Sequence, residues 1–575
     1  MSLLCATVLE ELFAVKFQCF PNSLCSSTTT RHLESAHYSS EKVRYASQIS
    51  SVAGKARVIR AGRGTIIENK PSLSPLVVRS LCGDFESIVR RLISPRQQQM
   101  TWEDPLTAHC SGFRTMQDNL SYSIAAQDIR GTIPENLKGR FFRIGPARNE
   151  LAGKPFGHWF DGDGAVSSFR IEDGQVHYRS SFVKTPKYLD ETAAQRVLYR
   201  SFGHNAPGGF FKNLHMPANC ANTSIVYHGG KLLSLFEGGR PWRLDLETLE
   251  TIGEEDFDGV LRTRDTYSAH GKIHPRTGDY INFGMAAGIT GPQMNLFRVS
   301  PSGRMVKRGK VKVDRMAFCH DNAMTENYLV VMVMPVSFKS PLNVILARDT
   351  IDQNMDYQPE LGMKVYVVSL DDFSLVRTFE VDPFAFAHCS NCWEENGELF
   401  VDVLQLNDEQ GEQGKAQFRD IFHQPFPASG KMQRYRFNMI TGSVQPEALP
   451  NELPCEFPQW DWRKTGTKSR IIYTAAICQN ETPGFYNALQ RIDLENGSVK
   501  VFDSGAGRYV SEPIFVPRTP DSPESQGYLL TAVYDASTEL SELVILDAET
   551  LSEPIATVPL KNHIPHGFHG GWSSL

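Results

Sequence analysis

The feature that most constrains the fold of this chain is a short pattern that recurs along most of its length. In each copy an apolar run ends in a polar turn and a second β-type run follows, as in "LQRIDLENGSVKVFD". Alternation of apolar and polar residues predicts a β-hairpin for each copy rather than a helix. About seven copies occur, and they begin near Phe169, Trp242, Leu296, Val365, Arg434, Leu489 and Leu543.

A lone hairpin of this kind cannot bury both faces of its sheet, so the copies are expected to stack on one another. Stacking around a common axis buries those faces and shields the sheet edges. The sequence therefore predicts an all-β fold, a seven-bladed β-propeller over residues 106–575, with helical and loop insertions that cap a site on the axis. A propeller by itself does not indicate chemistry, because binding scaffolds and enzymes share this fold.

Residues 1–105 differ from the repeats and are expected to form an N-terminal extension. Between Ser23 and about Arg63 the chain is rich in Ser and Thr and increasingly basic, as organelle transit segments are. Glu10 and Glu11 are unusual in such a segment, so a disordered extension is the alternative. The two interpretations correspond to a plastid or a cytoplasmic location. No apolar run reaches the length of about 18 residues that a transmembrane helix needs.

Charge and cysteine content exclude several classes of function. The net charge of −6 is mild for 575 residues and no basic stripe occurs, so nucleic acid is not an expected partner. The 11 cysteines are sparse and irregularly spaced, which indicates a reducing compartment rather than a disulfide framework. For the close pair Cys389 and Cys392 we expect ordinary buried thiols, with a zinc or redox site as the alternative.

Four of the 16 histidines share an unusual setting. Each ends an apolar or small-residue run, and each belongs to a different predicted blade. Because blades converge on one axis, single histidines from separate blades can meet there without a local spacing motif. Four neutral imidazoles suit a borderline divalent metal such as iron, copper or zinc. The candidate ligands are His270, His320, His388 and His569.

Three glutamates also stand among apolar residues, where an isolated carboxylate would be costly to bury. Histidine ligands usually donate their second ring N–H to a carboxylate or carbonyl, which fixes the tautomer that binds the metal. Glu237, Glu456 and Glu512 are therefore candidates for carboxylates behind the ligands. The alternative for each one alone is a position facing solvent or a nearby arginine.

Several segments resemble, in sequence and in order, motifs of the carotenoid cleavage oxygenases. They include "FDGDG", "LFEGG", "CHDNAMTENY", "EFPQW" and "GFHG", and the likeness runs from about Ser111 to the C-terminus. The resemblance implies a capped seven-bladed propeller that holds one Fe(II) per subunit on the four histidines named above. It also implies that Glu237, Glu456 and Glu512 orient, respectively, His320, His388 and His569, which leaves His270 without a carboxylate.

The resemblance further implies the reaction. Dioxygen, the co-substrate, would be added across a conjugated C=C bond of a hydrophobic carotenoid or apocarotenoid, giving two carbonyl products. No catalytic side chain beyond the metal site is expected. A stilbenoid cleavage dioxygenase is the main alternative, because Lys187 lies near where such enzymes place a phenol-binding lysine. A polyene isomerase and a non-catalytic scaffold are less favoured.

We also expect three further segments to lie around the site. The stretch from Arg196 to Pro217 combines aromatic and basic residues, which predicts peripheral membrane contact, with internal packing as the alternative. The loop from Phe160 to Gly164, "FDGDG", is expected to be a tight turn with positive φ at glycine and no metal ligand. His563 and His566 are expected to shape the approach to the metal.

Overall fold

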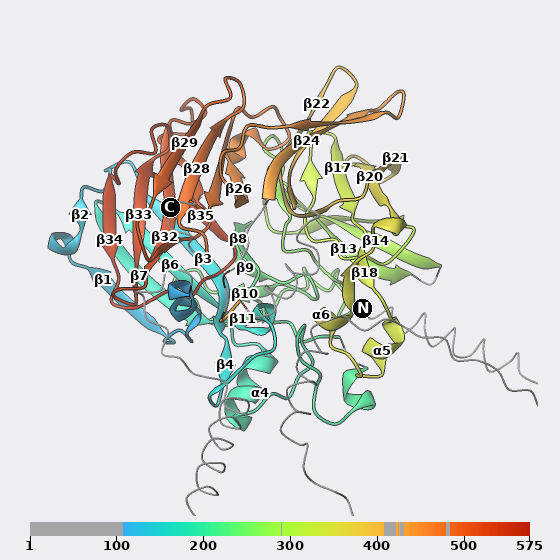
Figure 1. Ribbon diagram of the computed structural model, residues 1–575, viewed down its shortest axis with the longest axis horizontal. Helices are drawn as coiled ribbons and strands as arrows, with labels where there is room; N and C mark the ends of the chain where they lie inside the picture. Colours follow the sequence, from blue (N-terminus) through green and yellow to red (C-terminus); the bar gives the residue numbers. More distant parts are fainter. Residues whose placement is uncertain are drawn as a thin grey trace, which may run out of the picture. The chain divides into compact units, whose positions relative to one another are not determined.

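The computed structural model describes residues 107–574, except for 215, 289, 407–420, 424, 426–429 and 479–483. The extension predicted for residues 1–105 lies outside the described residues. Within them, antiparallel strands form seven blades, of which blades 5 and 6 are linked by one residue pair, Gly430 with Cys455. Innermost strands of neighbouring blades contact one another, for example β35 with β8 and β22 with β26 (Figure 1). The predicted all-β propeller is confirmed.

Each blade is a sheet whose strands run in order from the axis outward. Blades 1 and 2 are β35 (Gly570–Ser574), β3 (Gly139–Arg148), β6 (Asp163–Glu172), β7 (Gln175–Phe182) and β1 (Leu120–Ile124), then β8 (Ser224–His228), β9 (Lys231–Leu235), β10 (Trp242–Leu244) and β11 (Thr251–Glu254). Blades 3 and 4 are β12 (Lys272–Ile273), β13 (Tyr280–Gly288), β14 (Gly291–Val299) and β15 (Met305–Lys312), then β16 (Ala323–Met324), β17 (Tyr328–Val333), β20 (Met363–Ser369) and β21 (Leu375–Val381).

The remaining three blades follow the same order. Blades 5 and 6 are β22 (Ala385–Glu395), β23 (Glu398–Leu406), β24 (Gly430–Asn438) and β25 (Val444–Ala448), then β26 (Cys455–Trp460), β27 (Ile471–Ala476), β28 (Ala488–Asp493) and β29 (Val499–Asp503). In blade 7, β30 (Arg508–Val510) and β31 (Ile514–Pro517) both pair with β32 (Gly527–Asp535), and β33 (Leu540–Asp547), β34 (Ala556–Pro559) and β2 (Arg130–Gly131) follow.

The seven predicted hairpins are the third and fourth strands of the blades. They are β6–β7, β10–β11, β14–β15, β20–β21, β24–β25, β28–β29 and β33–β34. Side chains in the polar turns explain why these connections are tight, because a short Asp or Asn side chain can bond its own backbone two residues on. Asp245 accepts from the N–H of Glu247, and Asp547 accepts from the N–H of Glu549. The local pattern therefore encodes the outer half of every blade.

The core of the propeller lies between adjacent blades. Between blades 1 and 7, for example, Phe141 and Phe169 pack with Leu543 and Ile545, and all four side chains are fully buried. Burying one such side chain contributes roughly 1.5–3 kcal/mol. Similar clusters join blades 3 and 4 and blades 4 and 5, so each sheet buries both faces.

The two ends of the described chain meet in blade 1. The C-terminal strand β35 pairs antiparallel with β3, so that Phe141 lies opposite Trp572 and Arg143 opposite Gly570. In Figure 1 the red β35 lies beside the blue-green β3. The N-terminal strands β1 and β2 extend the outer edges of blades 1 and 7. The ring is thus closed by hydrogen bonding between distant parts of the sequence.

Insertions between strands form the predicted cap. They contain α4 (Pro186–Ala194), α5 (Pro341–Ile345), α6 (Ile351–Asn354) and the pair β18 (Val336–Phe338) with β19 (Met355–Tyr357). Two insertions are joined by Arg200, whose guanidinium donates to the carbonyls of Asn213 and Val344 at 2.6 and 2.8 Å. Short turns and a hairpin complete the fold: η1 (Ala108–Phe113), η2 (Ala126–Asp128), η3 (Trp159–Asp161), η4 (Phe210–Asn213), η5 (Pro359–Leu361), η7 (Trp462–Lys464), β4 (Glu150–Leu151) and β5 (Lys154–Pro155). None of the helices among the described residues is long and apolar enough to cross a membrane.

Truncation of the chain after His569 removes β35 but keeps the histidine, and we expect a clear fall in melting temperature. The truncation leaves the edge of β3 unpaired and removes Trp572 from the cluster between blades 1 and 7, which together cost on the order of 3 kcal/mol. Deletion of residues 1–50 should leave the melting temperature unchanged. Thermal unfolding followed by circular dichroism compares the two proteins, and equal melting temperatures would contradict the closing role of β35.

Candidate metal centre

The four candidate histidines lie near the starts of the innermost strands of four different blades. His270 lies two residues before the first residue of β12, His320 lies shortly before β16, His388 lies near the start of β22, and His569 directly precedes β35. The expectation that the apolar run ending at each histidine is a strand is wrong for three of the four. The residues before His270, His320 and His569, such as Phe568, line a cavity or pack in the core. Before His388, in contrast, Ala385 and Phe386 pair with β23.

Ring nitrogens of these histidines converge on one point. One nitrogen from each side chain lies within 4.8 Å of those of the other three. Nε2 of His320 and Nε2 of His388 are 3.2 Å apart, and the ring centroids of His270 and His569 are 4.6 Å apart. Among the described residues, no other group of three or more His, Cys, Asp or Glu side chains is placed to hold a metal.

Each candidate glutamate contacts Nδ1 of one histidine. Nδ1 of His388 lies 2.5 Å from Oε2 of Glu456, and Nδ1 of His569 lies 2.9 Å from Oε1 of Glu512. Glu237 makes the corresponding contact with Nδ1 of His320. A carboxylate at Nδ1 holds the ring proton there, so that the Nε2 lone pair is left for the centre of the cluster.

His270 lacks such a partner. The nearest carboxylate oxygens, on Glu237 and Asp321, are each 3.8 Å from its ring nitrogens. Its Nε2 is buried and has no hydrogen-bond partner among the described residues. Burial, and then the three neighbouring imidazoles, hold the pKa of His270 well below its usual value. A buried, neutral and unpartnered nitrogen is costly unless it binds something, so these residues fit a divalent metal.

Burial affects the other rings in different ways. It lowers the pKa of His569 even though Glu512 opposes the shift. For His388 the Glu456 carboxylate outweighs burial, and the pKa lies above its usual value. The four imidazoles therefore do not have equivalent surroundings.

Glu512 is buried and accepts hydrogen bonds from four groups. Besides His569 these are Arg143 at 3.1 Å, Gln459 at 2.8 Å and the backbone N–H of Gly570 at 2.6 Å. Burial acts to raise the pKa of this carboxyl, but His569 and Arg143 hold it below its usual value. The ionised carboxylate therefore fixes both His569 and the start of β35.

Sequence reasoning missed Asp321 and Asn322, which follow His320 directly. Oδ2 of Asp321 accepts the backbone N–H of Cys389 at 2.8 Å, and Nδ2 of Asn322 donates to the carbonyl of His270 at 2.7 Å. Both side chains are buried. They tie together the backbone segments that carry three of the histidines. The only sign of them in the sequence is that two polar residues stand directly before a buried strand.

Irregular strand pairing positions His388 and Glu456. The register of β22 against β23 shifts around His388, and that of β26 against β27 shifts directly after Glu456. Phe457 has a φ of 56°, which is uncommon for an aromatic residue. Such bulges redirect side chains beside active sites. Here the ring of Phe457 packs against His388 and His569, with centroids 5.5 and 5.4 Å away.

His563 and His566 contact the N-terminal segment of the described chain. The expectation that they shape the approach to the metal is therefore wrong. Nε2 of His566 lies 3.0 Å from the carbonyl of His109, and Nε2 of His563 lies 3.0 Å from the carbonyl of Arg114. Burial, and then the neighbouring His109, lowers the pKa of His566 to about 3. His566 is therefore a neutral structural residue that fastens η1.

The "FDGDG" loop contains no metal ligand, but the reason for its glycines differs from the prediction. Gly162 has a φ of −62°, and Gly164 also lies outside the positive-φ region. A Cβ on Gly164 would lie 2.0 Å from the carbonyl oxygen of Ala221, and one on Gly162 would lie 2.4 Å from Oδ1 of Asn149. Close backbone packing, not turn geometry, requires glycine here.

Cys389 and Cys392 are buried free thiols, as predicted. Burial raises the pKa of both well above the usual value. They pack among apolar side chains between blades 4 and 5. Neither belongs to the metal-type cluster.

An apolar cavity of about 310 Å³ opens onto the histidine cluster. Its wall combines blade residues with residues of the cap. The acidic residues of the wall are Glu237 and Glu456, and both contact histidines of the cluster. The volume lies within the range of pockets that enclose small hydrophobic ligands. Aromatic side chains of the wall include Trp159, Phe160, Phe202, Phe318, Phe338 and Phe568.

Lys187, which suggested a phenolic substrate, does not line this cavity. Its side chain is 2 % exposed, and Nζ lies 3.1 Å from Oδ1 of Asp163 and 3.3 Å from Oε2 of Glu191. A lysine held between two carboxylates is not available to a substrate phenol. The interpretation of Lys187 as a phenol-binding residue is therefore wrong.

Comparisons with known proteins agree with this geometry. The family model described as RPE65, retinal pigment epithelial membrane protein, matches residues 113–574. The apocarotenoid-15,15'-oxygenase of Synechocystis is 32 % identical over 492 residues, which cover 84 % of this chain and 98 % of the relative. The isoeugenol monooxygenase of Pseudomonas putida is 31 % identical, with 78 % and 94 % covered. The crystal structure of cobalt-substituted Synechocystis ACO superposes with a TM-score of 0.73 at 30 % identity, covering 81 % and 98 %.

Replacement of Glu512 by alanine should lower the free energy of unfolding by about 3–5 kcal/mol, because it leaves the buried guanidinium of Arg143 without its carboxylate. A matched control is Glu539→Ala, which removes an exposed pair with Arg114 and should cost about 1 kcal/mol or less. Urea unfolding of both variants, followed by tryptophan fluorescence, measures the difference. Equal losses would show that the pair of Glu512 with Arg143 does not anchor this part of the fold.

Proposed function

This chain belongs to the carotenoid cleavage oxygenase family, and on that premise we propose that it is an Fe(II)-dependent dioxygenase that splits a conjugated C=C bond of a carotenoid or apocarotenoid into two carbonyl products. The observation that carries the proposal is the convergence of four histidines, three buried and one half-buried, at the end of an apolar cavity. One Fe(II) per subunit would be held by His270, His320, His388 and His569. The oxygenases among its relatives support the enzyme class.

The three glutamates would support the ligands. Glu237, Glu456 and Glu512 each contact a histidine at Nδ1 and would fix the tautomer and the orientation of that ring. Removal of such a carboxylate typically weakens metal binding or activity by about 10–100-fold. His270 would rely on the packing of its loop, since Asn322 binds its backbone carbonyl.

The cavity would supply the remaining requirements of the reaction. Bound iron supplies the activation of dioxygen, so the chain needs no acid, base or nucleophile of its own. Aromatic residues such as Phe160, Phe202 and Phe318 exclude water and hold an extended apolar substrate in place. No lysine or arginine lines the cavity among the described residues, which favours an uncharged substrate.

A phenolic substrate is the second candidate, because the isoeugenol monooxygenase of Pseudomonas putida covers 78 % of this chain at 31 % identity. The position of Lys187 outside the cavity disfavours it. Since both reactions use the same centre, only the products distinguish them. A polyene isomerase would yield no carbonyl derived from dioxygen.

Anaerobic reconstitution with Fe(II), followed by labelled dioxygen and a β-apocarotenal, should give two labelled carbonyl products detectable by mass. His320→Ala should lose nearly all bound iron and activity, whereas His228→Ala, whose ring binds the carbonyl of Gly278 away from the cluster, should keep both. A parallel reaction with a hydroxystilbene tests the second candidate. Full activity in His320→Ala, or a wild-type protein that binds no iron, would refute the proposal.

We also propose peripheral membrane contact through the cap. Phe202 of the long insertion lines the cavity, so part of this segment packs inward. Phe211 in η4 is 78 % exposed, the adjacent Lys212 is also exposed, and Leu342 in α5 is 40 % exposed. Exposed aromatic and basic residues together favour an interface with anionic lipid. Such contact is compatible with either predicted location, plastid or cytoplasm.

Phe211→Asp should reduce binding to phosphatidylcholine–phosphatidylserine vesicles by about 30-fold, because a buried Phe contributes on the order of 2 kcal/mol. The control is Ile440→Asp, since Ile440 is 81 % exposed but lies in the turn between β24 and β25. Sedimentation of vesicles with each variant provides the measurement. Unchanged binding of Phe211→Asp would remove this surface from consideration.

A further inference from the structure

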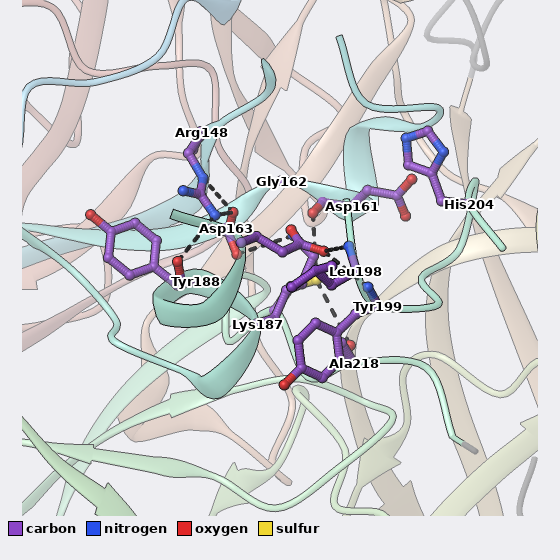
Figure 2. Close-up of polar contacts among 12 residues, drawn as sticks. Arg148, Asp161, Gly162, Asp163, Lys187, Tyr188, Leu198, Tyr199, His204 and Ala218 are labelled. Carbon is purple, nitrogen blue, oxygen red and sulfur yellow. Dashed lines mark hydrogen bonds and ion pairs between the residues drawn. The ribbon is translucent and has the colours of Figure 1, made fainter. Parts of the chain in front are cut away.

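A cluster of charged side chains is buried behind the cavity wall, outside the histidine cluster. It consists of Arg148, Asp163, Lys187 and Glu191, whose side chains are 8 %, 1 %, 2 % and 0 % exposed. Figure 2 shows Lys187 beside Asp163, with Arg148 reaching the same carboxylate. Buried charges of this kind are costly unless they are paired, so their positions are strongly constrained.

Lys187 is the centre of this cluster. Nζ contacts Asp163 at 3.1 Å and Glu191 at 3.3 Å, and it lies 4.4 Å from the ring centroid of Phe156. Burial acts to lower the pKa of Lys187, but the surrounding carboxylates outweigh it and raise the pKa. Because Lys187 and Glu191 are four residues apart on α4, the helix presents both groups on one face.

Glu191 connects the cluster to the cap. Its Oε1 accepts the backbone N–H of Leu198 at 2.9 Å and that of Tyr199 at 3.1 Å. Ser201 and Phe202, which follow closely in the chain, line the cavity. The carboxylate therefore fixes the point at which this segment enters the cavity wall.

Asp161 anchors the same segment from the opposite side. Both of its carboxylate oxygens lie within hydrogen-bond distance of the N–H of Gly203, at 3.0 and 3.1 Å. Trp159 and Phe160, immediately before Asp161, are also cavity residues. Backbone groups on either side of Phe202 are thus held by two buried carboxylates, and neither of these carboxylates lines the cavity itself.

We propose that Glu191, balanced by Lys187, is a positioning residue that fixes the cavity wall at Phe202 and thereby sets which double bond of a bound polyene lies at the histidine cluster. The proposal rests on the cleavage reaction proposed above. Neighbouring double bonds of a polyene are chemically alike, so selection between them depends on the register of the chain in the cavity. A displacement of about 1 Å at the reacting atoms can cost about 10²-fold in rate.

Two substitutions at one position test the role. Glu191→Ala removes the acceptor for both N–H groups, and we expect a higher KM and a mixture of products cut at neighbouring double bonds, with iron content unchanged. Glu191→Gln keeps a carbonyl acceptor, so it should restore the wild-type product ratio. Product masses, iron content and the separate values of kcat and KM are measured for both. An iron-loaded Glu191→Ala enzyme with wild-type KM and product ratio would overturn the proposal.

Amide hydrogen exchange of the wild-type protein provides a test that needs no variant and no turnover. The amides of Leu198 and Tyr199 should exchange at least about 10²-fold more slowly than those of the exposed Gly208 and Gly209. Rapid exchange at Leu198 and Tyr199 would overturn the proposal even if Glu191→Ala does not fold. If the wild-type protein cleaves no polyene, the proposed function fails. The role of Glu191 is then decided by the exchange of these amides and by the binding of a β-apocarotenal, which should be weaker for Glu191→Ala than for Glu191→Gln and the wild type.

Discussion

Antiparallel pairing of β3 with β35 is the contact on which the rest of the structure depends. It joins the last strand of the described chain to a strand near its beginning and makes an open series of blades into a ring. The same pairing brings Arg143 opposite Gly570, where its guanidinium reaches Glu512 and the carbonyl of Phe568. His569 directly follows Phe568, whose carbonyl Arg143 binds, and its own ring contacts Glu512, the other partner of Arg143. Ring closure and placement of the fourth histidine are therefore one structural event.

Charge balance at the axis follows from the same contacts. Glu237, Glu456 and Glu512 bring three carboxylates to the cluster, and Arg143 compensates one of them. The pair formed by Asp321 and Lys272 is neutral as a whole. Imidazoles that bind a metal are neutral, so two negative charges would then remain beside an apolar cavity. A divalent cation would balance them, which gives an electrostatic reason, independent of the ligand type, why this arrangement suits such an ion.

Features that depend on residues close in the sequence could be predicted, whereas features that depend on distant residues could not. The hairpins were predictable because turn residues such as Asp245 and Asp547 bond their own neighbours. The four histidines were recognisable by their apolar surroundings, which also reflect burial. The "FDGDG" glycines were misinterpreted, since the backbone of Ala221, which excludes a Cβ at Gly164, is far away in the sequence. The interpretation of Lys187 failed in part for the same reason, because its ammonium is held by the distant Asp163 as well as by the nearby Glu191.

The division between blades and insertions explains how one centre can serve different substrates. The histidines lie near the starts of inner strands, which are fixed on both sides by neighbouring blades, so the position of the centre hardly depends on the cap. The cavity wall, in contrast, takes Phe202 and Phe338 from insertions that lie outside the seven blade sheets. Relatives whose names refer to an apocarotenoid and to isoeugenol share most of this chain's length. In this chain the backbone of one such insertion is held by the buried carboxylates of Glu191 and Asp161, which lie outside the cavity wall, so the position of the wall depends on charges that a substrate does not contact.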